Sequence, residues 1–189
     1  MATWTFIRHG ESTANVESWY AGQSDSPLTE VGRIQAAELA QVLRHTSYDR
    51  VFASDLSRAL ETARAIVEGR GLELLVTPRL RERSCGALEG KSVAELERTG
   101  ALAAFYEFDG RPPGGESLRD VARRVLAYLA EIDAEGRSLV VSHGAVMRAT
   151  LGVLDGMPHE QIGHWKVGNC EVVERELALG TFAARLRTI

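Results

Sequence analysis

Short apolar runs alternate along this chain with longer segments whose apolar residues recur every three or four positions. The short runs indicate strands, and the longer spacing indicates helices with one buried face. We predict strands over residues 3–7, 50–53, 72–76 and 138–142. Helices are predicted over about 30–44, 117–134 and 143–154, and another one carries the apolar stripe Leu56, Ala59, Leu60 and Ala63. Such alternation is typical of a mostly parallel sheet sandwiched between helices, so an α/β fold is predicted.

Two closing strands are also predicted, over residues 171–176 and 182–187, on either side of Leu179-Gly180. Their exposed edge offers a surface for a homodimer. Residues 1–189 contain no Ser/Gly tract, like-charge block or internal repeat, so the chain is predicted to form a single domain.

Composition excludes several classes of protein. The 22 basic and 26 acidic residues give a net charge of −4, so the basic field that binds nucleic acid is missing. No run approaches the roughly 20 apolar residues of a membrane span, and the first residues do not resemble a signal peptide. Cys85 and Cys170 lie far apart, in no metal or redox spacing. We therefore expect a cytoplasmic protein that binds neither nucleic acid nor membrane.

Two predicted strands end in the same way, with a histidine followed by a glycine. Residues 4–7 run into Arg8-His9-Gly10, and residues 139–142 run into His143-Gly144. The carboxyl ends of strands line the ligand crevice of open α/β sheets, so neighbouring strands would bring both imidazoles into one pocket. A single such histidine is more often an ordinary turn residue, but the matched pair favours a site. A metal centre is not favoured, because no carboxylate or third histidine lies at ligand-like spacing.

Five motifs follow one another along nearly the whole chain. They are Phe6-Ile7-Arg8-His9-Gly10-Glu11-Ser12 with Asn15; Gly22-Gln23 with residues 25–29 and Gly32; residues 54–59 with Thr62-Ala63; Leu80-Arg81-Glu82 with Gly86 and residues 88–90; and residues 113–117 with residues 141–144. In this order they resemble the histidine phosphatase superfamily, the phosphoglycerate mutase-like group. Residues 113–117 and the short segment between Glu82 and His143 resemble the compact phosphatase branch of this superfamily. That branch includes broad-specificity phosphatases and α-ribazole phosphatase.

The resemblance implies a chemical role for five side chains. His9 would be the nucleophile that becomes a phosphohistidine, and Arg8 and Arg58 would hold the phosphoryl oxygens. His143 would donate a hydrogen bond to the charge that develops on them. Glu82 would protonate the leaving alkoxide and later accept a proton from water. The alternative, a surface carboxylate in an arginine-rich loop, is less favoured only because of the order of the motifs.

Substrate contacts are implied for a partly overlapping set of residues. They are Arg8, Asn15, Gly22, Gln23, Arg58 and Gly144. A plain turn is an equally good interpretation of Gly22-Gln23. The resemblance implies no cofactor and no metal ion. Arg79, Lys91 and Arg111 are candidate contacts for a second anionic group of the substrate, but solvated surface is the commoner place for such side chains.

Two features favour a hydrolase over a mutase: the segment between Glu82 and His143 is short, and no tail follows the last predicted strand. A mutase must keep its intermediate away from water, which takes a closing lid and a tail. We therefore expect a metal-independent phosphomonoesterase that acts on a small phosphorylated metabolite. Two alternatives stay open: a cofactor-dependent phosphoglycerate mutase, and a catalytically idle module that binds a phospho-ligand or a protein. Phosphorylation of His9 during exposure to substrate would distinguish an enzyme from a binding module.

Overall fold

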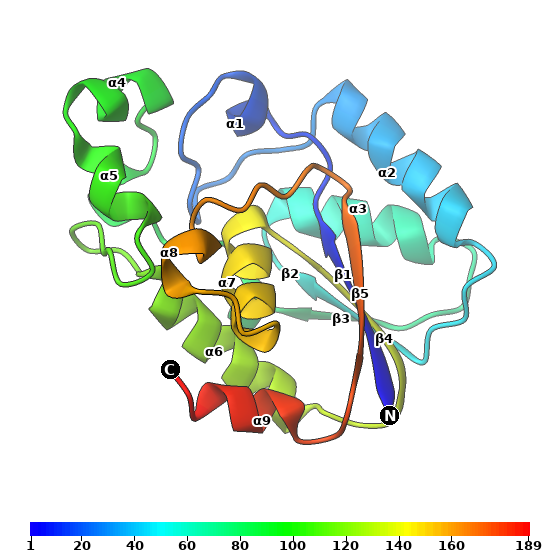
Figure 1. Cartoon of the computed structure of the whole chain (residues 1–189). Coiled ribbons are helices and arrows are strands. Elements are labelled where there is room, and N and C mark those ends of the chain that lie inside the picture. Colours follow the sequence, from blue (N-terminus) through cyan, green and yellow to red (C-terminus); the bar gives the residue numbers. More distant parts are fainter.

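A five-stranded sheet lies at the centre of the structure, with the strand order β3-β2-β4-β1-β5 (Figure 1). Its strands are β1 (Ala2–Arg8), β2 (Arg50–Ser54), β3 (Leu74–Thr77), β4 (Gly136–Ser142) and β5 (Val172–Leu177). The first four are mutually parallel, and β5 runs antiparallel to β1. This computed structural model describes the backbone of residues 1–189 and all side chains except those of residues 103 and 104. The predicted α/β fold with a mostly parallel sheet is confirmed.

Helices cover both faces of the sheet because alternate strand residues point to opposite sides. Trp4 and Phe6 of β1 pack in one cluster with α6 (Leu118–Glu131), α7 (Gly144–Leu154) and α9 (Thr181–Leu186). Ile7 packs in another cluster with α2 (Glu30–Leu43) and α3 (Ser57–Val67). Figure 1 shows these two helical layers on either side of the sheet. The central strands are therefore buried on both faces, which accounts for their uninterrupted apolar runs.

The last segment differs from the prediction. In the segment 182–187, expected as a second closing strand, residues 182–186 belong to the helix α9 and Arg187 is its C-cap. Gly180 has a positive φ of 83°, which turns the chain out of β5, and Ala183-Ala184 that follow favour helix. Phe182 is fully buried and Leu186 is partly buried against the same cluster, four residues further on. The pair therefore forms the buried face of a short helix, and β5 alone forms this edge of the sheet.

The helix α6 begins where the sequence places it. Ser117 is its N-cap, the Ser117 side chain accepts a hydrogen bond from the Asp120 N–H, and the Asp120 carboxylate accepts one from the Ser117 N–H. This reciprocal capping box satisfies two N–H groups that a helix start leaves without intrahelical partners. The Gly114-Gly115-Glu116-Ser117 motif therefore serves, at least in part, as the entry to a helix.

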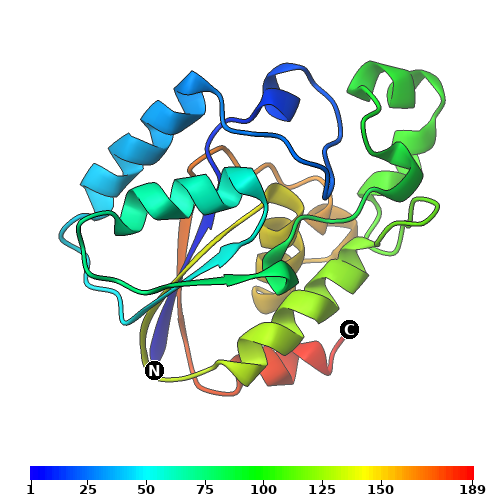
Figure 2. The same ribbon diagram turned by 180° about the vertical axis from the view of Figure 1, so that it is seen from behind.

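The strand connections open a crevice at the carboxyl ends of β1 and β4. These strands are neighbours, yet β1 leads to α2 on one face and β4 leads to α7 on the other. In open α/β sheets, ligands bind where neighbouring strands connect to opposite faces in this way. The short helix α1 (Thr13–Val16) and the insertion with α4 (Val93–Arg98) and α5 (Ala101–Tyr106) lie at this same end, as the two opposite views show (Figures 1 and 2).

The insertion has a small apolar core of its own. Cys85, Leu96, Leu102 and Phe105 are buried together, with Tyr20 packed against them. The Tyr20 and Tyr106 hydroxyl groups are 2.7 Å apart, which joins the loop after α1 to α5. In the described part of the chain, no helix combines the length and the apolar character needed to cross a lipid bilayer.

Candidate active site

His9 and His143 lie side by side, as expected if their strands are neighbours. Arg8 of β1 is paired with Ser142 of β4, and the His9 N–H donates to the Ser142 carbonyl at 3.0 Å. The two imidazole rings are 5.2 Å apart between centroids. Both rings are almost completely buried, with 3% of His9 and none of His143 exposed. Parallel strand pairing therefore places the two histidines at one end of the crevice.

The His9 ring is held in one tautomer. Its Nδ1 lies 2.7 Å from the Gly10 carbonyl oxygen, which can only accept, so Nδ1 carries the proton and Nε2 keeps its lone pair. Burial lowers the pKa of His9 well below its ordinary value, and the charges of Arg58 and Arg8 lower it further. At neutral pH the imidazole is therefore neutral, as a nucleophile must be.

Gly10 is required for this loop to pack against the start of α2. A Cβ at position 10 would lie 2.5 Å from the Gly32 carbonyl oxygen, too close for any side chain. The Gly10 N–H donates to the Thr62 hydroxyl of α3 at 3.1 Å. The turn that carries His9 is thus fixed from both α2 and α3.

His143 is the N-cap of α7, and its ring is positioned by a serine. His143 Nε2 lies 2.8 Å from the Ser54 hydroxyl at the end of β2. That hydroxyl also accepts from the Leu56 N–H at 3.3 Å. Nδ1 is buried and has no partner among the described residues. Burial, followed by the charge of Arg58, lowers the pKa of His143 well below its ordinary value. If the Ser54 hydroxyl donates to Nε2, the neutral His143 ring carries its proton on Nδ1.

Two arginines bring positive charge to the pocket without a carboxylate partner. Arg8 Nη1 donates to the Val167 carbonyl at 2.6 Å. Arg58, only 2% exposed, donates to the carbonyls of Gly22 at 2.8 Å and Ser24 at 3.2 Å. Among the described residues, no ion pair neutralises either guanidinium. Carbonyl groups hold both heads in place and leave their full charge available to an anion.

Glu82 points into the same pocket from the segment after β3. One carboxylate oxygen accepts from the Arg83 N–H at 2.8 Å, and the other accepts from the Ala145 N–H at 3.3 Å. Ala145 lies in the first turn of α7, where the helix dipole stabilises a negative charge. The flanking arginines are bound elsewhere: Arg81 pairs with Asp55, and Arg83 donates to three carbonyls of the insertion.

The implied substrate-binding residues separate into two groups. Asn15, Gly22 and Gly144 line the pocket together with Arg8 and Arg58. Gln23 does not line the pocket. Its side chain donates to the Glu82 carbonyl at 3.1 Å, so it supports the segment that carries Glu82.

An apolar wall covers one side of the pocket. It is formed by Trp19, Tyr20 and Phe105. Cys85 lies beneath it, and burial raises the pKa of its thiol to about 12, so it is not an activated nucleophile. Within the described side chains, no three His, Cys, Asp or Glu residues are grouped to hold a metal ion.

One important contact comes from a residue that the sequence analysis missed. Asn169, in the loop before β5, donates from Nδ2 to the His9 carbonyl at 3.0 Å and to Asn15 Oδ1 at 3.1 Å. Asn15 Oδ1 also accepts from the Ser12 N–H at 3.1 Å and from its hydroxyl at 3.2 Å. With its oxygen fully occupied, the Asn15 amide nitrogen is left as the donor toward the pocket. No local pattern in the sequence indicates Asn169, because its partners are more than 150 positions away.

The two buried histidines make stability depend on pH. Because each folded pKa lies well below that of an unfolded histidine, about 6.5, the unfolded state binds more protons as the pH falls through 6.5. The free energy of unfolding therefore decreases as the pH is lowered below 6.5. Each histidine should contribute about 1.4 kcal/mol per pH unit to this decrease. Urea unfolding at pH 7.5 and 5.5 measures the difference in the free energy of unfolding. We expect His9→Gln to reduce the fall between these pH values by about 1.4 kcal/mol.

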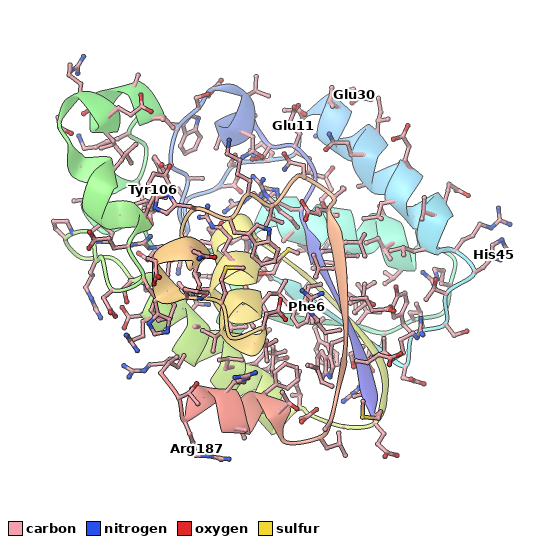
Figure 3. All side chains as sticks on the ribbon, viewed as in Figure 1. Phe6, Glu11, Glu30, His45, Tyr106 and Arg187 are labelled. Carbon is pink, nitrogen blue, oxygen red and sulfur yellow. The ribbon has the colours of Figure 1, made fainter. Side chains whose placement is uncertain are left out.

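The exposed His45 provides the control, since His45→Gln should keep the pH dependence of the wild type (Figure 3). A His9→Gln variant with the same pH dependence as the wild type would show that the pKa of His9 is the same in the folded and unfolded states.

Known proteins resemble this chain over nearly its whole length. The sequence profile of the histidine phosphatase superfamily (branch 1) matches residues 4–188. A probable phosphoglycerate mutase GpmB of Enterobacter sp. (strain 638) is 36% identical over 173 residues, which cover 88% of this chain and 80% of that protein. A mycobacterial glucosyl-3-phosphoglycerate phosphatase, solved with VO3, superposes with a TM-score of 0.85 at 31% identity and 92% coverage of both chains. The α-ribazole phosphatase of Shigella flexneri superposes with a TM-score of 0.82 at 32% identity, over 93% of this chain and 91% of that one.

Proposed function

This chain belongs to the histidine phosphatase superfamily, and we propose that it hydrolyses phosphomonoesters of small metabolites without a metal ion, through a phosphohistidine on His9. One observation carries the proposal. A neutral imidazole with a free Nε2 lies in a pocket beside Arg8 and Arg58, whose charges have no carboxylate partner among the described residues. A phosphate ester needs this combination of a nucleophile and fixed positive charge.

In the first step His9 Nε2 attacks phosphorus, and the bond from phosphorus to the ester oxygen breaks. Glu82 gives its proton to the leaving alkoxide, so an alcohol departs and the phosphoryl group stays on His9. Arg8, Arg58 and the Asn15 amide nitrogen donate to the phosphoryl oxygens. His143 adds the hydrogen bond of its Nδ1–H, which has no partner among the described residues.

In the second step a water molecule attacks the phosphohistidine. The Glu82 carboxylate accepts a proton from this water, the phosphorus–nitrogen bond breaks, and inorganic phosphate leaves. Glu82 is then protonated again and His9 is neutral, so the cycle closes with no other reactant. The Arg83 and Ala145 N–H groups fix Glu82 in position for both proton transfers.

A phosphoglycerate mutase is a second candidate, favoured by two observations. Trp19, Tyr20 and Phe105 line the pocket with apolar rings, which would help to keep water from a phosphorylated intermediate. The relatives named probable phosphoglycerate mutase are also similar over 88% of this chain. In a mutase, the alcohol of a second substrate would take the phosphoryl group in place of water.

Phosphate release in excess EDTA tests the proposal, with p-nitrophenyl phosphate, glycerol 1-phosphate and 3-phosphoglycerate as substrates. Conversion of 3-phosphoglycerate to 2-phosphoglycerate is followed in the same samples, and acid quenching with labelled ester detects acid-labile phosphohistidine. We expect phosphate release and a labelled His9. Isomerisation faster than release would make the protein a mutase. Saturable binding of inorganic phosphate with no label and no turnover would make it a binding module.

A further inference from the structure

Arg148 of α7 lines the active-site pocket but takes no part in holding it together. Its Nε is buried and has no hydrogen-bond partner in the described part of the chain. No described carboxylate lies within ion-pair distance of its guanidinium. Leaving a buried donor unpaired costs free energy, so such a group needs an explanation.

Arg8 shares a buried Nε without a partner, but the other arginines of the pocket are hydrogen-bonded to the protein, whereas the Arg148 side chain makes no hydrogen bond to the described residues. Arg8 donates to one carbonyl, Arg58 to two and Arg83 to three, so each is held in a fixed place. Their positive charges make the pocket still less favourable for a fourth cation, and Arg148 has only Glu82 as an acidic neighbour among the lining residues. A substrate anion would relieve this repulsion.

The cations that the sequence suggested for a second anionic group are already engaged. Arg79 pairs with Glu131, Lys91 pairs with Glu95 at 2.8 Å, and Arg111 pairs with Asp120 at 2.6 Å. None of the three lines the pocket. Arg148 is therefore the better candidate, and helical spacing is the signal that indicates it, since it lies four residues after Gly144.

The position of Arg148 also sets the distance between the phosphoryl group and a second group bound in the pocket. Gly144 and Arg148 are one turn apart on α7, a rise of about 6 Å along the helix. Gly144 and His9 lie where the phosphoryl group would bind, and Arg148 lies one turn further along the same face of α7. Its neighbours in the lining include the apolar wall and Val167. A group bound by Arg148 is thus a few bonds away from the transferred phosphoryl group.

We propose that Arg148 binds a second anionic group of the substrate, a carboxylate or a second phosphate, and so selects small phosphomonoesters that carry one. The guanidinium fork suits both groups, because each can accept two parallel hydrogen bonds from it. This proposal rests on the proposed phosphatase function and names the substrate class of that site.

Three substrates with the same three-carbon skeleton test the proposal: 3-phosphoglycerate, glycerol 1,3-bisphosphate and glycerol 1-phosphate. Besides the phosphate to be transferred, they carry a carboxylate, a second phosphate and no further anion, respectively. We expect Arg148→Gln to lower kcat/KM for the substrate with the preferred second anion by about tenfold or more, mainly through KM. The value for glycerol 1-phosphate should stay within about twofold, which also shows that the variant is folded. Of 3-phosphoglycerate and glycerol 1,3-bisphosphate, the one whose kcat/KM falls more identifies the preferred second anion.

Two further variants sharpen the result. Arg148→Lys, which keeps the charge and loses the fork, should recover part of the selectivity. Arg187→Gln removes the same charge from an exposed position after α9 and should leave all three values unchanged (Figure 3).

The proposed subsite and the proposed function fail in different ways. If the wild type hydrolyses all three esters and Arg148→Gln lowers them equally or not at all, the subsite is wrong and the phosphatase stands. If the wild type hydrolyses none of the esters and His9 takes no label, the phosphatase assignment itself is wrong.

Discussion

Replacement of His9 by alanine is expected to lower kcat for phosphate release by about four orders of magnitude or more, for every ester. The reason is that no other described group of the pocket can take over. Cys85 is buried with a pKa raised to about 12, and His143 Nε2 is engaged with the Ser54 hydroxyl. The measurement is release of inorganic phosphate at high enzyme concentration, together with loss of the acid-labile label. Binding of inorganic phosphate should persist, because Arg8 and Arg58 are held by carbonyl groups rather than by His9.

The matched control is His45→Ala, which removes an imidazole from an exposed position after α2 (Figure 3). It should keep the activity of the wild type. Circular dichroism and the urea midpoint of both variants establish that each is folded. A folded His9→Ala protein that retains a tenth of the wild-type kcat would disprove the assignment of His9 as nucleophile.

Glu82→Gln is expected to separate substrates by their leaving groups. Glutamine cannot give a proton to the alkoxide of glycerol 1-phosphate, so kcat/KM for this ester should fall by about 100-fold to 10,000-fold. The phenolate of p-nitrophenyl phosphate departs without a proton, so its first step should change by less than about tenfold. Because glutamine keeps a carbonyl oxygen that can accept from Arg83 or Ala145, the surrounding loop should be preserved.

The first step is best measured for both esters by the rate of His9 labelling in a rapid-quench experiment. Glu30→Gln makes the same chemical change at an exposed position of α2 and should alter neither rate (Figure 3). Equal losses on the two esters would show that Glu82 acts through charge or position and is not the general acid.

The sequence was sufficient to predict the part of the site that lies on the sheet. Parallel strands present their carboxyl ends at one edge, so two strands that both end in His-Gly predicted that His9 and His143 would meet, as they do. The helix start at Ser117 was also predictable, because a capping box is a local pattern. In each case the determining interaction lies within a few residues or follows from the direction of the strands.

Features that depend on distant contacts could not be predicted in the same way. Residues 182–187 alternate well enough to suggest a strand, and burial of Phe182 against the cluster of α6 and α7 decides for a helix. The role of Asn169 could not be predicted, because it depends on the loop before β5 lying beside Asn15 in the folded chain. Arg148 could have been found from its helical spacing to Gly144, but its missing partner is a property of the folded pocket.

The loop before β5 links the proposed phosphate-binding groups to the order in which the chain folds. Arg8 is anchored by the carbonyl of Val167, 159 positions away, and the His9 carbonyl is held by Asn169, 160 positions away. Closing contacts between segments so distant in sequence is slow and entropically costly, so these contacts are expected to form late. The pairing of β1 with β4 joins segments 134 positions apart and is of the same kind, since Ala2 pairs with Gly136. An intermediate in which only β2, β3, β4 and their helices are paired would therefore lack both β1 with His9 and the anchors of Arg8 and Asn15. Recovery of turnover during refolding therefore reports the final stage of assembly, whereas recovery of helical circular dichroism reports an earlier one.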